Sequence, residues 1–491
     1  MLRIYAKDHI EEIQAFINTA DGVKDVVELK TEFPSTLTGM YVKVEGDNIE
    51  FPLPWDGLEP PVVVGDFSFS EDHLAAAILL KLGHYEAVAN YADDPLILEK
   101  AAAFQSFTSG VNLLQSGKAE NESDLVNRFL VSQYLQPEDF QSLVSTYQQL
   151  ADRVQDKGLK AFLMKHVAVF AIDAREMEFA HQLLQEAMQL VDDHKSALFS
   201  IRYDWINLEM EDLSVAKIND KFDDLKDLIT ETMNYYESCG HEIYVANLLV
   251  QASEIANISN SYAESLGYIN RAVQIFENED LPEFLGQAFL RKATLLQTWA
   301  QNGNPQFFKP ALSTYQEALK YFRKDQYPHV YADIHHNLAV IYAEMPIEEN
   351  KKGMMAAYSA SSFNECLEFY NKQDYPYEYA MVANNYASAL MKYPPAKQGD
   401  NVESAVYYFN EALFVRTAEN YPYERVRTIL NYLESCWQAD NINEIMEKAR
   451  YNDMVAKARE VKSLTNDPDL LAQAEEHLEY LKQLSVTLLK S

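Results

Sequence analysis

Small and large apolar residues recur in one fixed pattern along the second half of this chain. Four segments carry a small, a large and a small residue at positions i, i+4 and i+7, which places the three side chains on one face of a helix. The four triads are Ser265/Ile269/Ala272, Ala311/Tyr315/Ala318, Ser359/Phe363/Cys366 and Ala405/Phe409/Ala412. Ten residues after each triad comes a proline: Pro282, Pro328, Pro376 or Pro422. A proline in the first turn of a helix loses no hydrogen bond, so we predict that each one opens a second helix.

The four prolines lie 46, 48 and 46 residues apart along the chain. A period in this range is typical of stacked helical hairpins, in which each pair of helices buries its apolar face against the next pair. Only 15 of the 491 residues are glycine, and a chain so poor in glycine is not expected to form a turn-rich β fold. We therefore predict a mostly α-helical solenoid.

The first 70 residues follow a different pattern. Ile10–Ile17 has the spacing of a short amphipathic helix, and residues 41–51 alternate around Gly46-Asp47, which indicates a β-hairpin. An extended, proline-rich link with Trp55 follows, and then Ser70, which we predict to cap the next helix. We divide the chain into a small α+β N-terminal module, degenerate helical hairpins, regular repeats and C-terminal capping helices, at residues 1–70, 71–215, 216–440 and 441–491.

The net charge of −34 narrows the range of expected partners. Proteins bind nucleic acid and anionic lipid through clustered lysine and arginine, so this charge argues against both. It is compatible with a solvated acidic surface or with a basic protein partner. No apolar run approaches the ~18 residues of a membrane span, and the three cysteines show neither a disulfide framework nor a zinc-site spacing. We therefore predict a cytoplasmic protein without a membrane span.

The sequence carries none of the common catalytic or cofactor-binding signatures. GxGxxG, GxxxxGK[ST], GxSxG and CxxC are all absent, and the HEIYV segment at 241–245 lacks the second histidine of a zinc-protease motif. His329 and Asp333 share a helix face, but a zinc site would need further ligands. We expect no catalytic, cofactor-binding or metal-binding residues, and hence a protein that is not an enzyme.

The segment Asn337–Tyr342 and the triad after it resemble a tetratricopeptide repeat (TPR). In that family one helix carries a leucine, a small residue and a tyrosine, and its partner carries alanine, an aromatic residue and alanine. The matching residues here are Leu338, Ala339 and Tyr342, then Ser359, Phe363 and Cys366. The units exceed the usual length of about 34 residues and are similar to those of kinesin light chains and many bacterial signalling proteins. The resemblance implies a right-handed α–α superhelix with a concave groove.

An asparagine recurs at one position of the repeat, as Asn337, Asn385 and Asn431. In the peptide-binding proteins that this chain resembles, an asparagine there faces the groove and pairs with the backbone of a bound peptide. An amide both donates and accepts, which suits an extended chain, although it can also pair with a neighbouring helix or with water. Asn384, Tyr331 and Tyr379 are further candidates for the groove, and the two tyrosines can instead serve in packing.

These features predict a non-catalytic interaction scaffold that binds a peptide or a helix of another protein in a concave solenoid groove. Two alternatives stay open. The chain can be a structural subunit of a large assembly, in which the solenoid edges and residues 1–70 make fixed contacts. It can also be a regulatory or sensor subunit of an effector enzyme carried on another chain. The sequence identifies no particular partner.

Overall fold

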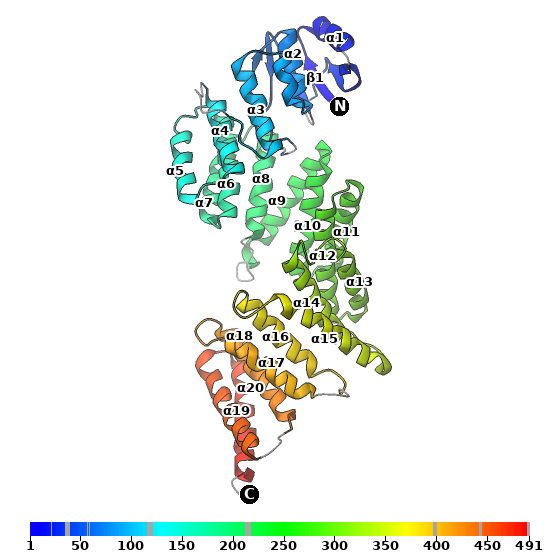
Figure 1. Ribbon diagram of the computed structural model, residues 1–491, viewed down its shortest axis with the longest axis vertical. Coiled ribbons are helices and arrows are strands. Elements are labelled where there is room, and N and C mark those ends of the chain that lie inside the picture. The colour runs from blue at the N-terminus through cyan, green and yellow to red at the C-terminus, as the bar shows by residue number, and fades with distance from the viewer. Residues whose placement is uncertain are drawn as a thin grey trace. The chain divides into compact units, whose positions relative to one another are not determined.

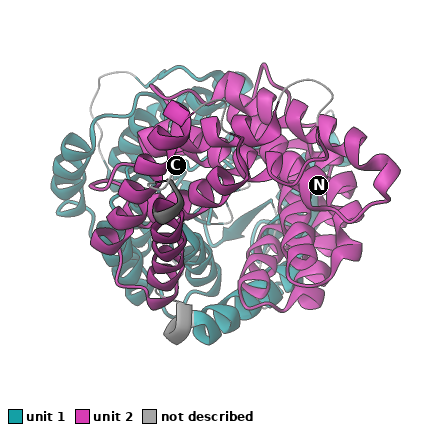
Figure 2. Cartoon of the chain, turned by 90° about the horizontal axis from the view of Figure 1, so that it is seen from below, with its two compact units in different colours: residues 1–244 teal, residues 245–491 magenta. Residues whose placement is uncertain are grey.

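The computed structural model describes residues 1–20, 22–34, 40–55, 57, 59–114, 121–211, 218–395, 400–440 and 444–488. The chain forms two compact units, Met1–Tyr244 and Val245–Ser491 (Figure 2). The boundary between them lies inside helix α10, Glu242–Ile258. Each unit is described separately below.

The first unit begins with a mixed five-stranded sheet in the order β2-β1-β3-β4-β5. Its strands are β1 (Leu2–Ala6), β2 (Val27–Lys30), β3 (Tyr41–Glu45), β4 (Asn48–Glu50) and β5 (Phe67–Ser68). Helix α1 (Ile10–Thr19) and the 3-10 turn η1 (Val23–Asp25) connect β1 to β2, which run parallel, and β1 also pairs in parallel with β3. The predicted hairpin is confirmed, because β3 and β4 pair antiparallel with Glu45 opposite Asn48. Strands β1 and β2 were not predicted from the sequence.

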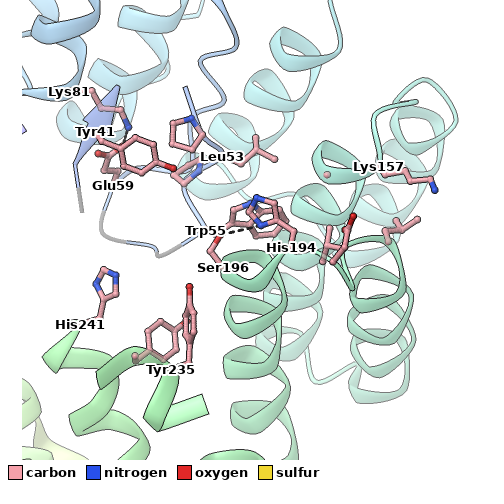
Figure 3. Close-up of a pocket in the computed structure, with 17 residues that line it drawn as sticks. Tyr41, Leu53, Trp55, Glu59, Lys81, Lys157, His194, Ser196, Tyr235 and His241 are labelled. Carbon is pink, nitrogen blue, oxygen red and sulfur yellow. Dashed lines mark hydrogen bonds and ion pairs between the residues drawn. The ribbon is translucent and has the colours of Figure 1, made fainter. Parts of the chain in front are cut away.

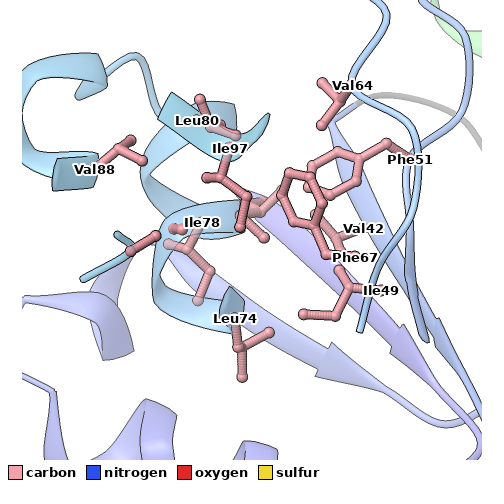
Figure 4. Packing of buried hydrophobic residues seen from close by; sticks show 14 of the residues in the cluster. Val42, Ile49, Phe51, Val64, Phe67, Leu74, Ile78, Leu80, Val88 and Ile97 are labelled. Atoms are coloured by element: carbon pink, nitrogen blue, oxygen red, sulfur yellow. The ribbon is translucent and has the colours of Figure 1, made fainter. Parts of the chain in front are cut away.

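Two helices, α2 (Glu71–Lys81) and α3 (Pro95–Ser109), with the 3-10 turn η2 (Tyr85–Asn90) between them, complete the core of the sheet. Figure 4 shows Val42, Ile49 and Phe67 of the sheet packed against Leu74 and Ile78 of α2. The predicted cap of α2 is confirmed, because the Ser70 hydroxyl accepts a hydrogen bond of 3.1 Å from the backbone N–H of His73. The hydrophobic core of the N-terminal module therefore does not stop at residue 70.

The rest of the first unit consists of antiparallel helices with a second core (Figure 1). They are α4 (Glu122–Leu135), α5 (Phe140–Ala151), α6 (Lys157–Asp173), α7 (Met177–Leu190), α8 (Lys195–Glu211) and α9 (Ile218–Cys239). Trp55 and Val63 of the proline-rich link belong to this second core, although they come from the segment that joins the strands. The link thus connects the sheet to the helices by packing as well as by sequence.

The second unit consists of paired helices. As predicted, each of the four recurring prolines begins a helix. The helices are α11 (Tyr262–Asn278), α12 (Pro282–Gln301), α13 (Phe308–Ala318), α14 (Pro328–Glu344), α15 (Lys352–Phe369), α16 (Pro376–Leu390), α17 (Asn401–Val415), α18 (Pro422–Gln438), α19 (Glu444–Leu464) and α20 (Pro468–Leu488). Short 3-10 turns, Pro305–Phe307 and Glu349–Lys351, precede α13 and α15. Helices α19 and α20 lie within residues 441–491, the segment for which C-terminal capping helices were predicted.

All twelve triad residues lie on α11, α13, α15 and α17, and none is more than 1% exposed. Their small members also accept or donate at close range: the Ser359 hydroxyl donates to the carbonyl of Ala339 at 2.6 Å, and the Cys366 thiol donates to that of Ala332 at 3.2 Å. Small residues allow two helices to approach closely, and the large central residue fills the groove between them. The predicted α-solenoid with a small α+β module is confirmed.

Candidate peptide-binding face

Three helices of the second unit carry an asparagine at the same distance from their opening proline. Asn337 lies on α14, Asn385 on α16 and Asn431 on α18, each nine residues after the proline. We call the side of α14, α16 and α18 that carries these residues the asparagine face. On α12 the same position holds Arg291, whose guanidinium pairs with the Glu254 carboxylate of α10 at 3.1 Å.

Asn385 is already paired inside the protein. Its amide nitrogen lies 2.9 Å from Nε2 of His336 on α14, and its Oδ1 accepts from the amide of Asn384 at 3.2 Å. Burial lowers the pKa of His336 to about 4, so at neutral pH the ring is uncharged and its Nε2 can accept the proton of the Asn385 amide. The buried Oδ1 of Asn384 has no hydrogen-bond partner in the described part of the chain.

Asn337 and Asn431 differ from Asn385 in that neither side chain forms a hydrogen bond with any of the residues described. Asn337 is half-buried and Asn431 is exposed. Asn385 itself lines a hollow of about 230 Å³ between α12, α14 and α16, together with Gln301, Val340 and Ser388. The structure therefore places two unpaired amides and one paired amide at equivalent positions.

The two candidate tyrosines both make contacts inside the protein. The Tyr379 hydroxyl donates to the Glu411 carboxylate of α17 at 2.6 Å, and the Lys372 ammonium lies 5.5 Å from the centre of the Tyr379 ring. Tyr331 packs on the ring of His335 at 4.4 Å, with the Lys324 ammonium 5.9 Å above it. A residue six positions before the asparagine does not share its helix face, because six residues turn an α-helix by about 600°.

A second hollow opens between α18 and α20, and sequence reasoning missed all of its residues except Asn431. We call it the α18–α20 hollow; its volume is about 670 Å³. It is lined by Leu430, Asn431, Glu434 and Trp437 of α18 and by Gln473, Glu476, His477 and Tyr480 of α20. The signal was present in the sequence, because 473, 476, 477 and 480 have the i, i+3, i+4, i+7 spacing of one helix face.

The first unit shows how its helices hold an extended segment. The side-chain amide of Asn127 on α4 accepts from the backbone N–H of Val63 at 2.7 Å and donates to the carbonyl of the same residue at 2.8 Å. Trp55 is 5% exposed and meets the ring of Phe162 on α6 edge-on, with 5.3 Å between ring centres. The Ser200 hydroxyl of α8 donates to the Trp55 carbonyl. The proline-rich link is therefore bound by three helices of its own unit, α4, α6 and α8.

Beside this link lies a cavity of about 380 Å³ (Figure 3). Its walls include Tyr41, Trp55, His194, Tyr235 and His241, with polar and charged groups between the aromatic rings. The Lys81 ammonium and the Glu59 carboxylate on its rim pair with each other at 2.5 Å. Because the cavity is lined by aromatic rings and by side chains of both charges, it indicates no particular class of ligand.

The side chains of His329 and Asp333, which share a helix face, both contact other residues of the protein. The ring of His329 contacts the rings of Phe369 and Tyr375, and the Asp333 carboxylate accepts from the Tyr370 hydroxyl at 2.6 Å. No three His, Cys, Asp or Glu side chains among the described residues converge in a way that could hold a metal ion. None of the helices in the described ranges is both long and apolar enough to cross a membrane.

No known protein family matches the sequence, and no curated protein matches it either. Solved structures similar to the chain include a signal-transduction ATPase with a tetratricopeptide repeat sensor from Pyrococcus horikoshii, at 16% identity and a TM-score of 0.46. That match covers 81% of this chain and 55% of the archaeal one, so this chain spans about half of that protein. The apo form of the quorum sensor NprR from Bacillus thuringiensis has 13% identity, with 72% of this chain and 97% of that chain covered and a TM-score of 0.44.

The Cut9–Hcn1 heterotetramer is also similar, at 12% identity and a TM-score of 0.33, over 84% of this chain and 93% of that one. Likenesses at this level add nothing to what the packing of this chain establishes. The buried triads, the prolines at the helix starts and the close helix pairs make the second unit a tetratricopeptide-like solenoid.

Proposed function

We propose that this chain is a non-catalytic protein-interaction scaffold whose asparagine face binds an extended segment of a partner protein. The observation that carries the proposal is that Asn337 and Asn431 hold equivalent positions on α14 and α18 and that their side-chain amides bond to no described residue. An extended peptide presents one N–H and one C=O per residue, and a side-chain amide can satisfy both. Asn385 lies on α16, which comes between α14 and α18 in the chain, and it lines a hollow of the asparagine face.

The chain itself provides a precedent for this chemistry. Asn127 holds the backbone N–H and C=O of Val63 with two hydrogen bonds, both shorter than 3 Å. Val63 lies in a segment outside the helices and strands, so its backbone groups were available to the asparagine as those of a bound peptide would be. This contact supports the proposal that an asparagine on a helical pair recognises extended backbone, although Asn127 lies in the other unit.

The charge of the chain supports a basic partner. A net charge of −34 attracts a basic segment over a distance and raises its association rate, and salt screens that attraction. We therefore expect binding to weaken as the salt concentration rises. The direct contacts at the asparagines determine which segment is retained after encounter.

A selection experiment tests the proposal without a known partner. The full-length chain is presented to an mRNA-display library of random 12-residue peptides, and the enriched peptides are measured by fluorescence anisotropy. We expect the double variant Asn337→Ala/Asn431→Ala to bind them about 10- to 30-fold more weakly, because each amide contributes hydrogen bonds of about 1 kcal/mol net.

The matched control is Asn410→Ala. Asn410 is also exposed, but it lies on α17 and its amide donates to the carbonyl of Val406 in its own helix. This variant should bind the selected peptides as the unchanged chain does. Peptides that bind the double variant and the control equally well would contradict the proposed site. A chain that enriches no peptide but co-purifies with stoichiometric partners would instead favour a structural subunit of an assembly.

A further inference from the structure

The α18–α20 hollow combines aromatic rings with carboxylates. Trp437 and Tyr480 stand edge to face, with ring centres 6.3 Å apart and planes at 88°. Trp437 is 38% exposed and Tyr480 49%, so both rings present surface to a ligand. The Trp437 indole N–H donates to Nδ1 of His477 at 2.9 Å, which fixes the orientation of the indole. A fixed tryptophan face is the preferred aromatic surface for a cation.

Among the residues that the structure describes, no lysine or arginine pairs with the carboxylates of the hollow. Glu434 forms no ion pair with any described residue, and Glu476 only accepts a hydrogen bond from the Tyr480 hydroxyl at 2.8 Å. No lysine or arginine is among the residues that line the hollow. Burial lowers the pKa of His477, against the opposite effect of Glu434 and Glu476, so this ring does not neutralise the two carboxylates at neutral pH.

We propose that the α18–α20 hollow binds the guanidinium of an arginine in the partner protein, which rests on the proposed function of the asparagine face. Charge complementarity requires a cation, because two uncompensated carboxylates border the site. A guanidinium is planar, stacks on an aromatic ring and offers several N–H donors, and so it can reach Glu434 and Glu476 while it covers Trp437. A lysine ammonium has no planar face to stack.

One feature places this arginine in a peptide rather than in a free small molecule. Asn431 of the asparagine face also lines the hollow, so a peptide bound along that face reaches the hollow without a break. The volume of about 670 Å³ leaves room for further groups beside the arginine. We infer that the arginine anchors the end of the bound segment at α18.

Fluorine NMR tests the site directly. The full-length chain is labelled with 5-fluorotryptophan, which gives one signal for each of its four tryptophans, and Trp437→Phe identifies the relevant one. The protein is titrated with N-acetyl-arginine methylamide, with the corresponding lysine compound and with N-acetyl-citrulline methylamide, which keeps the shape but carries no charge. We expect the Trp437 signal to shift saturably with the arginine compound, at several-fold higher concentration with lysine, and not with citrulline.

The variant Glu434→Gln/Glu476→Gln should weaken the response to arginine about fivefold or more, because it removes two exposed ion pairs. Its matched control is Glu419→Gln/Glu479→Gln, which removes the same charge outside the hollow and should leave the response unchanged. The proposal is overturned by a missing shift, by an equal response to citrulline or lysine, or by a response that survives in the first variant. A failure of the display experiment would refute the proposed function alone, since this titration uses no peptide.

Discussion

Replacing Gly286 by alanine is expected to destabilise the second unit, although the same change stabilises most helices. Gly286 lies inside α12, where the chain passes close to the turn after α13. A Cβ added there would lie 2.7 Å from the Cβ of Tyr321 and 3.2 Å from two ring carbons of Phe322. The first contact is shorter than real Cβ atoms allow, and the Cβ of Tyr321 cannot move without its backbone.

Two opposing contributions decide whether Gly286→Ala raises or lowers the free energy of unfolding. Alanine is favoured over glycine in a helix interior by about 1 kcal/mol. Overpacking a well-packed helix contact costs about 1–3 kcal/mol, so we expect a net loss of about 1 kcal/mol. The control is Gly267→Ala in α11, since a Cβ at Gly267 meets no atom within 4 Å. There only the helix preference acts, and the chain should gain about 0.5–1 kcal/mol.

Thermal unfolding of the full chain measures both variants. For a unit of this size a change of 1 kcal/mol shifts the Tm by about 2–4 °C, so the two variants should move in opposite directions. Because a solenoid can unfold in parts, hydrogen exchange of the α12 amides locates the effect. If Gly286→Ala raised the Tm as much as Gly267→Ala, α12 and α13 could separate freely, and the role assigned to small residues in these pairs would be refuted.

Three further predictions follow from the packing. Ala318→Leu and Ala412→Leu should each destabilise the chain by about 1–3 kcal/mol in thermal unfolding, because both alanines are fully buried between helices; normal melting of both would contradict the repeat register. Asn127→Ala should cost about 2–3 kcal/mol and expose the amide of Val63 to hydrogen exchange, because the buried link loses both hydrogen bonds. The folded-state pKa of His336, about 4, lies below its unfolded value of 6.5, so its stabilising contribution is present above pH 6.5 and is lost as the pH falls towards 4. Urea unfolding measures the free energy of unfolding at pH 6.5 and at pH 4. Between these values the unchanged chain should lose about 3 kcal/mol more of it than His336→Gln does, and equal losses would disprove a neutral buried ring.

The solenoid could be predicted from the sequence because its signals are local. The triad spacing follows from the geometry of one helix, and a proline at a helix start needs only its own ring and the residue before it. Strands β1 and β2 carry no such signal. They pair in parallel across a helical connection, with Leu2 opposite Val27, so their pairing depends on contacts between residues far apart in the sequence. Strand β1 also lacks the alternation of a half-buried strand, because Arg3 is its only exposed residue and the other four are buried.

The repeat pattern predicts the positions of the three asparagines, but it does not predict which of them pairs with a residue of the preceding repeat. Asn385 pairs with His336, which lies one position before the asparagine of the preceding repeat. On α12 the position equivalent to His336 is occupied by Leu290. Leucine has no side-chain acceptor, so Asn337 lacks the partner that Asn385 has. For Asn431 the equivalent residue is Asn384, which forms no hydrogen bond with it; the Asn384 amide donates to Asn385, and its Oδ1 bonds to none of the described residues. Whether an asparagine at this position is paired inside the protein therefore depends on one side chain of the neighbouring helix. On this reasoning, Leu290→His would give Asn337 the acceptor that Asn385 already has, and peptide affinity should fall without any change to an asparagine.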